Sequence, residues 1–147
     1  IKDISFDKLI KVLTINTIGP TLVGKYFIPY LRKDSKSTFA FLSARVGSIS
    51  DNKLGGWYSY RASKTALNQS IRNFSIEVAR SNKNAIFIGL QPGPVKSFLS
   101  KPFEKNVKSE NLFTPEFSAK KMLEVIEKLD SSDSGKVFAW DCEEINT

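Results

Sequence analysis

Residues 85–90, Ala-Ile-Phe-Ile-Gly-Leu, followed directly by Gln91-Pro92-Gly93-Pro94, form the stretch of the chain that decides its fold. The run has no polar side chain, which is typical of a strand buried on both of its faces. The Pro-Gly-Pro turn ends it. Residues 38–42 and 135–140 are predicted as two further strands. Strands of this apolar kind favour a parallel sheet that is covered by helices on both faces.

Two long helical segments precede and separate the first two strands. The apolar residues of segment 5–32 repeat with helical periodicity, and Gly19-Pro20 is expected to kink this helix without ending it. Residues 57–80 carry a second apolar stripe, which includes Leu67.

A third helix is predicted after the second strand. Thr114 is expected to cap it, and Pro115 is expected at its first position. Its expected buried face consists of Met122, Leu123, Ile126 and Leu129. Helix and strand thus alternate three times, which predicts a single α/β domain over residues 1–147 with a doubly wound parallel sheet. Ligands in such folds bind at the carboxyl ends of the strands.

Composition limits the functions that the chain can have. Its 147 residues are 41% hydrophobic and 25% charged, as in an ordinary soluble domain, and no apolar run approaches the roughly 20 residues of a membrane helix. The chain has no histidine and one cysteine, so we expect no metal site, no internal disulfide and a cytoplasmic location. The net charge of +7 is spread along the chain, so we expect no nucleic-acid partner.

Tyr60 and Lys64 are the first candidates for chemistry. They stand four residues apart at the start of the predicted helix 57–80, so they share one helical face, whereas Tyr58 lies on another. A unit charge about 4 Å away is worth about 4 kcal/mol at an effective dielectric constant of about 20, so Lys64 is expected to lower the pKa of Tyr60. The alternative is a surface tyrosine beside a solvated lysine, although Lys64 falls on the apolar stripe of Leu67.

Four motifs in order resemble the short-chain dehydrogenase/reductase family. The pattern of Tyr60 and Lys64, with Ala62-Ser63 between them, is similar to the catalytic helix of that family. Asn16 resembles its active-site asparagine, and the run from Pro92 to Ser97 resembles its nicotinamide loop. Two longer strings are similar to the branch that contains C-factor and sniffer-type carbonyl reductases: Ser43-Ala44-Arg45-Val46-Gly47-Ser48-Ile49 and Gly55-Gly56-Trp57-Tyr58-Ser59-Tyr60-Arg61.

The resemblance implies a Rossmann-type fold and roles for individual residues. Tyr60 would be the general acid or base for a carbonyl or alcohol substrate, and Lys64 would also bind the nicotinamide ribose. Asn16 would hold a water molecule in a proton relay. The alternative for Asn16 is a structural amide that ties the kinked helix to a neighbouring strand.

The substrate-polarising serine is less well defined by the sequence. The family places it three residues before a glycine, and the residue three positions before Gly47 is Ala44. Ser43 takes the role if the backbone is shifted locally, or Ser48 takes it, or the hydroxyl is absent. Ser43 can also be read as a strand-end serine that closes the turn.

The resemblance also implies the cofactor, NAD or NADP. Pro92, Gly93, Val95 and Ser97 would contact its nicotinamide end, and the alternative for these residues is a plain turn. The family's glycine-rich pyrophosphate turn has no counterpart in the chain. We therefore expect the C-terminal portion of a longer family member, inactive by itself.

Partners follow from the same comparison. Helices 5–32 and 57–80 resemble the pair that forms a four-helix interface in the family, so a homodimer or homotetramer is expected. Substrate choice would depend on residues 100–112, whose sequence carries no recognisable chemistry. The alternative function is a binding or dimerisation module that keeps the fold without the chemistry.

Overall fold

The computed structural model describes residues 1–2, 4–97 and 112–147 of the chain. Along the described sequence the helices and strands are α1 (Phe6–Leu13), the π-helical segment η1 (Thr14–Ile18), α2 (Gly19–Phe27), β1 (Ser37–Leu42), α3 (Tyr58–Val78), β2 (Ala85–Gln91), α4 (Pro115–Lys128) and β3 (Val137–Ala139). Short 3₁₀ turns are η2 (Ile28–Tyr30), η3 (Arg45–Gly47) and η6 (Ser131–Asp133). The three strands form a parallel sheet in the order β1-β2-β3. The predicted α/β fold is confirmed.

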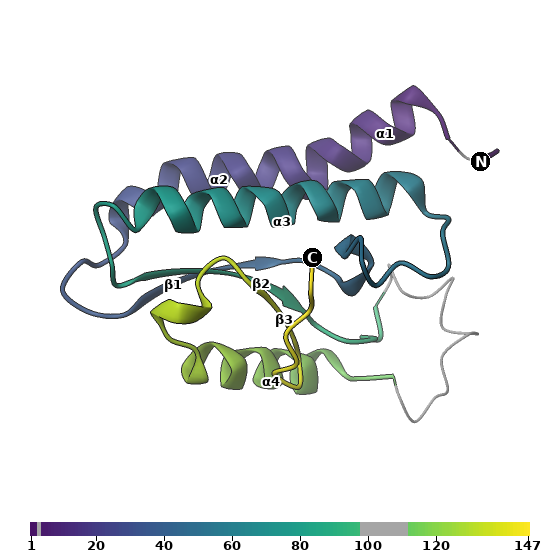
Figure 1. The fold of residues 1–147 in the computed structure, drawn as a ribbon. Helices are drawn as coiled ribbons and strands as arrows, with labels where there is room; N and C mark the ends of the chain where they lie inside the picture. Colours follow the sequence, from purple (N-terminus) through teal and green to yellow (C-terminus); the bar gives the residue numbers. More distant parts are fainter. Residues whose placement is uncertain (3, 98–111) are drawn as a thin grey trace.

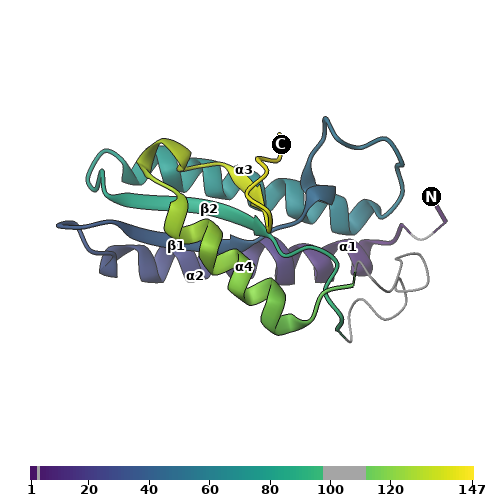
Figure 2. The same cartoon turned by 90° about the horizontal axis from the view of Figure 1, so that it is seen from below.

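Helices cover both faces of this sheet. α1, α2 and α3 lie on one face, and α4 lies on the other (Figure 1). The view from below shows α1 and α2 running beside α3 (Figure 2). Because the strands are parallel, their carboxyl ends all point towards the same edge of the sheet.

The core has one cluster on each face of β2. Buried residues on the α3 side are Phe41, Leu67, Ile71, Ala85 and Phe87. Buried residues on the α4 side are Ile86, Ile88, Leu90, Val125, Leu129 and Phe138. Alternate residues of β2 therefore enter opposite layers, as the period of two along a strand requires. The prediction that residues 85–90 are buried on both faces is confirmed.

Two details of burial differ from the predictions. β1 lies at the edge of the described sheet, so its burial is partial, and Leu42 is 61% exposed. In α4, Thr114 caps the helix with Pro115 at its start, as predicted. Leu123, however, is 60% exposed, and Val125 is fully buried in its place, because Val125 shares a helical face with Leu129 and Leu123 does not.

The first predicted helix continues through Gly19-Pro20, as expected, but the turn just before them is π-helical. The π-helical segment η1 precedes Gly19, whose N–H donates to the carbonyl of Thr14, five residues back. Pro20 has no N–H to donate to the carbonyl of Asn16. A wider π turn accommodates that missing bond, and such turns recur at functional sites.

The chain after β3 folds back along the sheet edge. It turns at Cys142, which has a left-handed φ of 72°. Ala139 N–H then donates to the carbonyl of Glu143 at 2.8 Å, and Ile145 N–H donates to the carbonyl of Val137 at 2.8 Å. Ile145 is buried against Val137 and Ala139. The outer edge of β3 is thus covered by the chain itself.

Within the described residues, no helix is both long enough and apolar enough to span a membrane.

Candidate active site

The predicted site residues gather at the carboxyl edge of the sheet. Just after β1, Ser43 N–H donates to the carbonyl of Leu90 at 2.8 Å, which continues the pairing of β1 with β2. Lys64 comes from α3 and donates from Nζ to the carbonyl of Leu42, the last residue of β1, at 2.8 Å. The loop that begins at Pro92 leaves β2 at the same edge. This is where ligands bind in open parallel sheets.

Tyr60 and Lys64 lie in the first two turns of α3 and share one face, as predicted. The Nζ atom of Lys64 is 5.9 Å from the centroid of the Tyr60 ring. Lys64 is 8% exposed, and Tyr60 is half-buried. Lys64 is therefore a buried cation whose hydrogen bond goes to a strand-end carbonyl.

Burial controls the protonation of both side chains. It raises the pKa of Tyr60 and lowers the pKa of Lys64 from their ordinary values. For Tyr60 this direction is opposite to the predicted one. The Lys64 ammonium faces the ring and donates to Leu42. At neutral pH the Tyr60 phenol keeps its proton, which suits a proton donor.

Asn16 contacts the same part of α3. Its Nδ2 donates to Oγ of Ser63 at 3.1 Å, and Ser63 Oγ donates to the backbone carbonyl of Tyr60 at 2.8 Å. Thr17 adds a bond from Oγ1 to the carbonyl of Ser63 at 2.8 Å. Asn16 thus ties η1 to the helix that carries Tyr60, whereas the structural alternative had placed its partner on a strand. Ser63 was missed as a partner, although its place between Tyr60 and Lys64 offered a signal.

The two candidate serine hydroxyls both donate into the protein. Ser43 is buried, and its Oγ donates to Oδ1 of Asn68 at 2.6 Å. Ser43 follows Phe41 by two residues, so it points to the same side of the sheet, under α3. Ser48 is also buried, and its Oγ donates to the carbonyl of Asn146. Ala44, which has no hydroxyl, is half-buried between them.

The loop after β2 is a tightly packed turn. Gly93 has a φ of 78°, and a Cβ added there would lie 2.5 Å from the Phe113 ring and 2.9 Å from Trp140. Pro92 accepts a hydrogen bond from Ser118 Oγ at 2.7 Å, and Val95 forms a bridge with Phe113.

Ser97, the last predicted contact of the cofactor, is exposed. Residues 100–111 of the predicted substrate segment 100–112 lie outside the described residues.

These residues fit one end of a nicotinamide cofactor. The buried Lys64 ammonium offers N–H donors of the kind that ribose hydroxyls accept, and the turn at Gly93 follows β2 at the same edge of the sheet. In the portion of the chain that the structure describes, no three His, Cys, Asp or Glu side chains are grouped so that they could hold a metal ion.

Sequence comparison finds relatives over nearly the whole chain, although no protein-family model matches it. C-signal of Myxococcus xanthus is 31% identical over 143 residues, which are 97% of this chain and 81% of that protein. The 1-hydroxy-2-glutathionyl-2-methyl-3-butene dehydrogenase of Rhodococcus sp. (strain AD45) is 32% identical over 133 residues, which are 90% of this chain and 56% of that protein.

Solved structures agree with this relationship. Carbonyl reductase Sniffer of D. melanogaster matches all of this chain and 60% of its own, with a TM-score of 0.86 and 23% identity. The carbonyl reductase from chicken fatty liver, solved with NADPH bound, also matches all of this chain and 60% of its own, with a TM-score of 0.85 and 27% identity. The chain thus spans less than two thirds of the dehydrogenase and of both reductases. Together with the C-signal match, which covers 97% of this chain and 81% of C-signal, these findings establish that the chain belongs to the short-chain dehydrogenase/reductase family.

Proposed function

We propose that the protein containing this chain is an NAD(P)-dependent oxidoreductase that transfers a hydride between a nicotinamide cofactor and a carbonyl or alcohol substrate. The observation that carries the proposal is the placement of Tyr60 beside the buried Lys64 at the carboxyl edge of a parallel sheet. Burying a cation costs stability, so the presence of the buried Lys64 beside a half-buried phenol favours a functional role. The relatives named as a dehydrogenase and as carbonyl reductases support the same reaction class.

The residues of the chain would handle the proton. In the direction of reduction, the Tyr60 hydroxyl donates its proton to the substrate oxygen, and the phenolate that remains is stabilised by the Lys64 ammonium. In the reverse direction, the phenolate takes the proton of an alcohol. A bound nicotinamide supplies or accepts the hydride. Asn16 acts through Ser63 by fixing the turn of α3 that carries Tyr60.

The loop after β2 would hold the nicotinamide end of NAD or NADP. Pro92, Gly93, Val95 and Ser97 are the proposed contacts, because this turn leaves β2 at the carboxyl edge of the sheet, where β1 also ends at Leu42. The glycine-rich pyrophosphate turn is not in this chain, so we propose that residues 1–147, a single domain, do not bind the cofactor tightly by themselves. Titration of the isolated chain with NADH and NADPH, followed by fluorescence, tests this. Micromolar affinity would contradict it.

Replacing Tyr60 by Phe in the full-length protein is the direct test of the reaction. Loss of a general acid typically lowers turnover by about 10²- to 10⁴-fold. We expect this loss with cofactor affinity nearly unchanged. Tyr58→Phe is the matched control, because Tyr58 lies on another face of the helix. Retained activity in Tyr60→Phe would refute the assignment.

A second candidate function is a non-catalytic binding or dimerisation module. The observation that favours it concerns the hydroxyl groups that follow β1. Those of Ser43 and Ser48 donate hydrogen bonds to other residues of the chain, and Ala44 has no hydroxyl to offer a substrate. Comparing the wild type with Tyr60→Phe distinguishes the two candidate functions. A module predicts that wild type turns over no carbonyl substrate and that Tyr60→Phe leaves the phenotype unchanged.

Self-association through helices 5–32 and 57–80 is proposed under either function. Large apolar side chains are exposed along the first of these segments: Phe6, Ile10, Ile15, Ile18, Leu22, Val23, Tyr26 and Phe27. Large apolar side chains exposed repeatedly along one helical segment favour an interaction site. We propose a homodimer or homotetramer in the cytoplasm, and light scattering after size-exclusion chromatography gives the mass that tests the assembly.

A further inference from the structure

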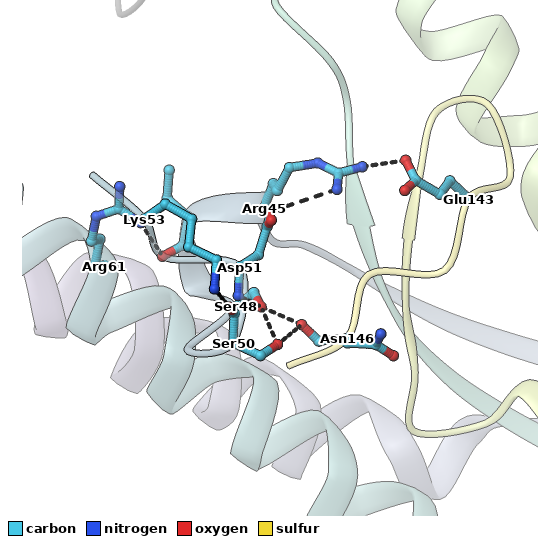
Figure 3. Close-up of polar contacts among 9 residues, drawn as sticks. Arg45, Ser48, Ser50, Asp51, Lys53, Arg61, Glu143 and Asn146 are labelled. Atoms are coloured by element: carbon cyan, nitrogen blue, oxygen red, sulfur yellow. Dashed lines mark hydrogen bonds and ion pairs between the residues drawn. The ribbon is translucent and has the colours of Figure 1, made fainter. Parts of the chain in front are cut away.

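The last residues of the chain contact the loop that follows β1. Glu143 forms an ion pair with Arg45, which also lies 3.6 Å from Asp51. The carbonyl of Asn146 accepts a hydrogen bond from Ser48 Oγ. Figure 3 shows these contacts converging from the returning C-terminal segment onto one side of the loop. Residues 143–146 are called the strap below.

The strap is itself anchored to the sheet. Between its two polar contacts, Ile145 is buried against β3, and its N–H donates to Val137. Glu144 also pairs with Lys136 at 3.4 Å. The strap therefore joins the edge of β3 to the loop after β1, two parts of the molecule that the sheet alone does not connect.

The loop held by the strap packs directly on Lys64. A Cβ added to Gly47 would lie 2.8 Å from Cβ of Lys64 and 2.9 Å from its backbone carbon. The carbonyl of Gly47 accepts a hydrogen bond from Thr65 Oγ1 at 2.9 Å, and the carbonyl of Val46 accepts one from Arg61 at 3.3 Å. Contacts at Arg61, Lys64 and Thr65 thus fix η3 (Arg45–Gly47) to the first two turns of α3.

We propose that the strap is a positioning device for the active site: Glu143 and Asn146 hold η3 against α3, and η3 fixes the backbone and stem of Lys64. Arg45, Glu143 and Ser48 are positioning residues, because their proposed effect reaches Lys64 through η3. Ion pairs between exposed side chains add little to global stability. The strap therefore acts on local order at the start of α3 rather than on overall unfolding.

Hydrogen exchange measured on the chain itself tests this without reference to catalysis. The N–H groups of Gly47 and Ser48 close η3, and that of Arg61 closes the first turn of α3. In Glu143→Gln we expect exchange at these amides to be faster by about threefold or more, with a melting temperature within about 2 °C of wild type. Asp34→Asn is the matched control, because it breaks an exposed ion pair with Arg32 far from the strap.

A double mutant shows whether Arg45 and Glu143 act on hydrogen exchange as a pair or independently of each other. If Arg45 acts through Glu143, then Arg45→Gln combined with Glu143→Gln speeds exchange no more than either change alone. As a second signature, NMR titration of the Lys64 ε-methylene should show its pKa rising towards that of an exposed lysine in Glu143→Gln, since burial lowers it in wild type. Unchanged exchange at Arg61 and an unchanged Lys64 titration would overturn the proposal, even if η3 alone became looser.

The kinetic consequence rests on the proposed function. In the full-length enzyme, Glu143→Gln should lower kcat several-fold with substrate KM unchanged. If exchange and the Lys64 titration respond as expected but wild type has no turnover, the strap stands and the oxidoreductase proposal fails. If wild type is active and Glu143→Gln matches it in kcat while η3 is loosened, the strap does not position the site.

Discussion

Replacing Lys64 by Met should make the folded chain more stable at neutral pH while removing a residue of the proposed site. Lys64 is 8% exposed, and its ammonium donates to the carbonyl of Leu42 at 2.8 Å. A hydrogen bond of this kind to a charged group stabilises the folded state by about 1.5–3 kcal/mol. Removing an ammonium group from water destabilises it by several kcal/mol. The lowered pKa of Lys64 indicates that desolvation outweighs the bond. Met keeps the apolar stem, so we expect a gain of about 1 kcal/mol.

The stability gained by Lys64→Met should change with pH in a direction that can be measured. The pKa of Lys64 is lower in the folded chain than in the unfolded one, so its neutral form is favoured by folding. The penalty is present at neutral pH, where both states are charged, and it fades as pH rises through the folded pKa towards the unfolded value of 10.5. The advantage of Lys64→Met should therefore shrink in alkaline solution.

Urea unfolding at pH 7 and at pH 10, with thermal melts alongside, measures this. A gain of about 1 kcal/mol corresponds to a melting temperature higher by about 2–4 °C for a domain of this size. Lys83→Met is the control, because Lys83 is exposed and should change stability by less than about 0.5 kcal/mol. Destabilisation of Lys64→Met at pH 7 would refute the reasoning, since it would mean that the bond to Leu42 outweighs desolvation.

Three further predictions concern packing and assembly. Gly93→Ala should destabilise the chain by about 2–4 kcal/mol, because the new side chain meets both a positive φ and a clash with its neighbours. Gly55 also has a positive φ but lies in open space, so Gly55→Ala should destabilise the chain by only about 1 kcal/mol. Denaturant titration of both variants measures the difference. Leu67→Ala removes a fully buried side chain and should cost about 2–5 kcal/mol, while Leu123→Ala at an exposed position should cost less than about 0.5 kcal/mol. Val23→Glu puts a charge on the exposed apolar face of α2 and should lower the assembled mass in light scattering; an unchanged mass would place the interface elsewhere.

Local signals in the sequence account for what could be predicted. The apolar run of β2 indicates burial on both faces because no alternation is present, and the structure fills both core layers from it. Thr114 and Pro115 define the start of α4 by themselves, since a cap needs only its own first turn. Tyr60 and Lys64 share a face because helical spacing alone requires it.

Contacts between distant residues account for what could not be predicted. The direction of the Ser43 hydroxyl depends on Asn68, which lies on the helix that covers it. The pKa of Tyr60 depends on how far the fold buries its phenol, and the Lys64 ammonium donates to the carbonyl of Leu42 at the end of β1. No spacing rule gives either contact, because each arises from how α3 lies across the sheet.

The strap also has a consequence for the order in which the molecule folds. The contacts of Arg45 with Glu143 and of Ser48 with Asn146 each join residues 98 positions apart. Closing so long a loop from the unfolded chain carries an entropic cost of about 4 kcal/mol, and β3 must pair first to shorten it. During synthesis these residues are also added after the sheet and α3. We therefore expect the start of α3 to become ordered last. In a nascent chain the hydrophobic core would then form before the residues of the proposed active site are fixed in place.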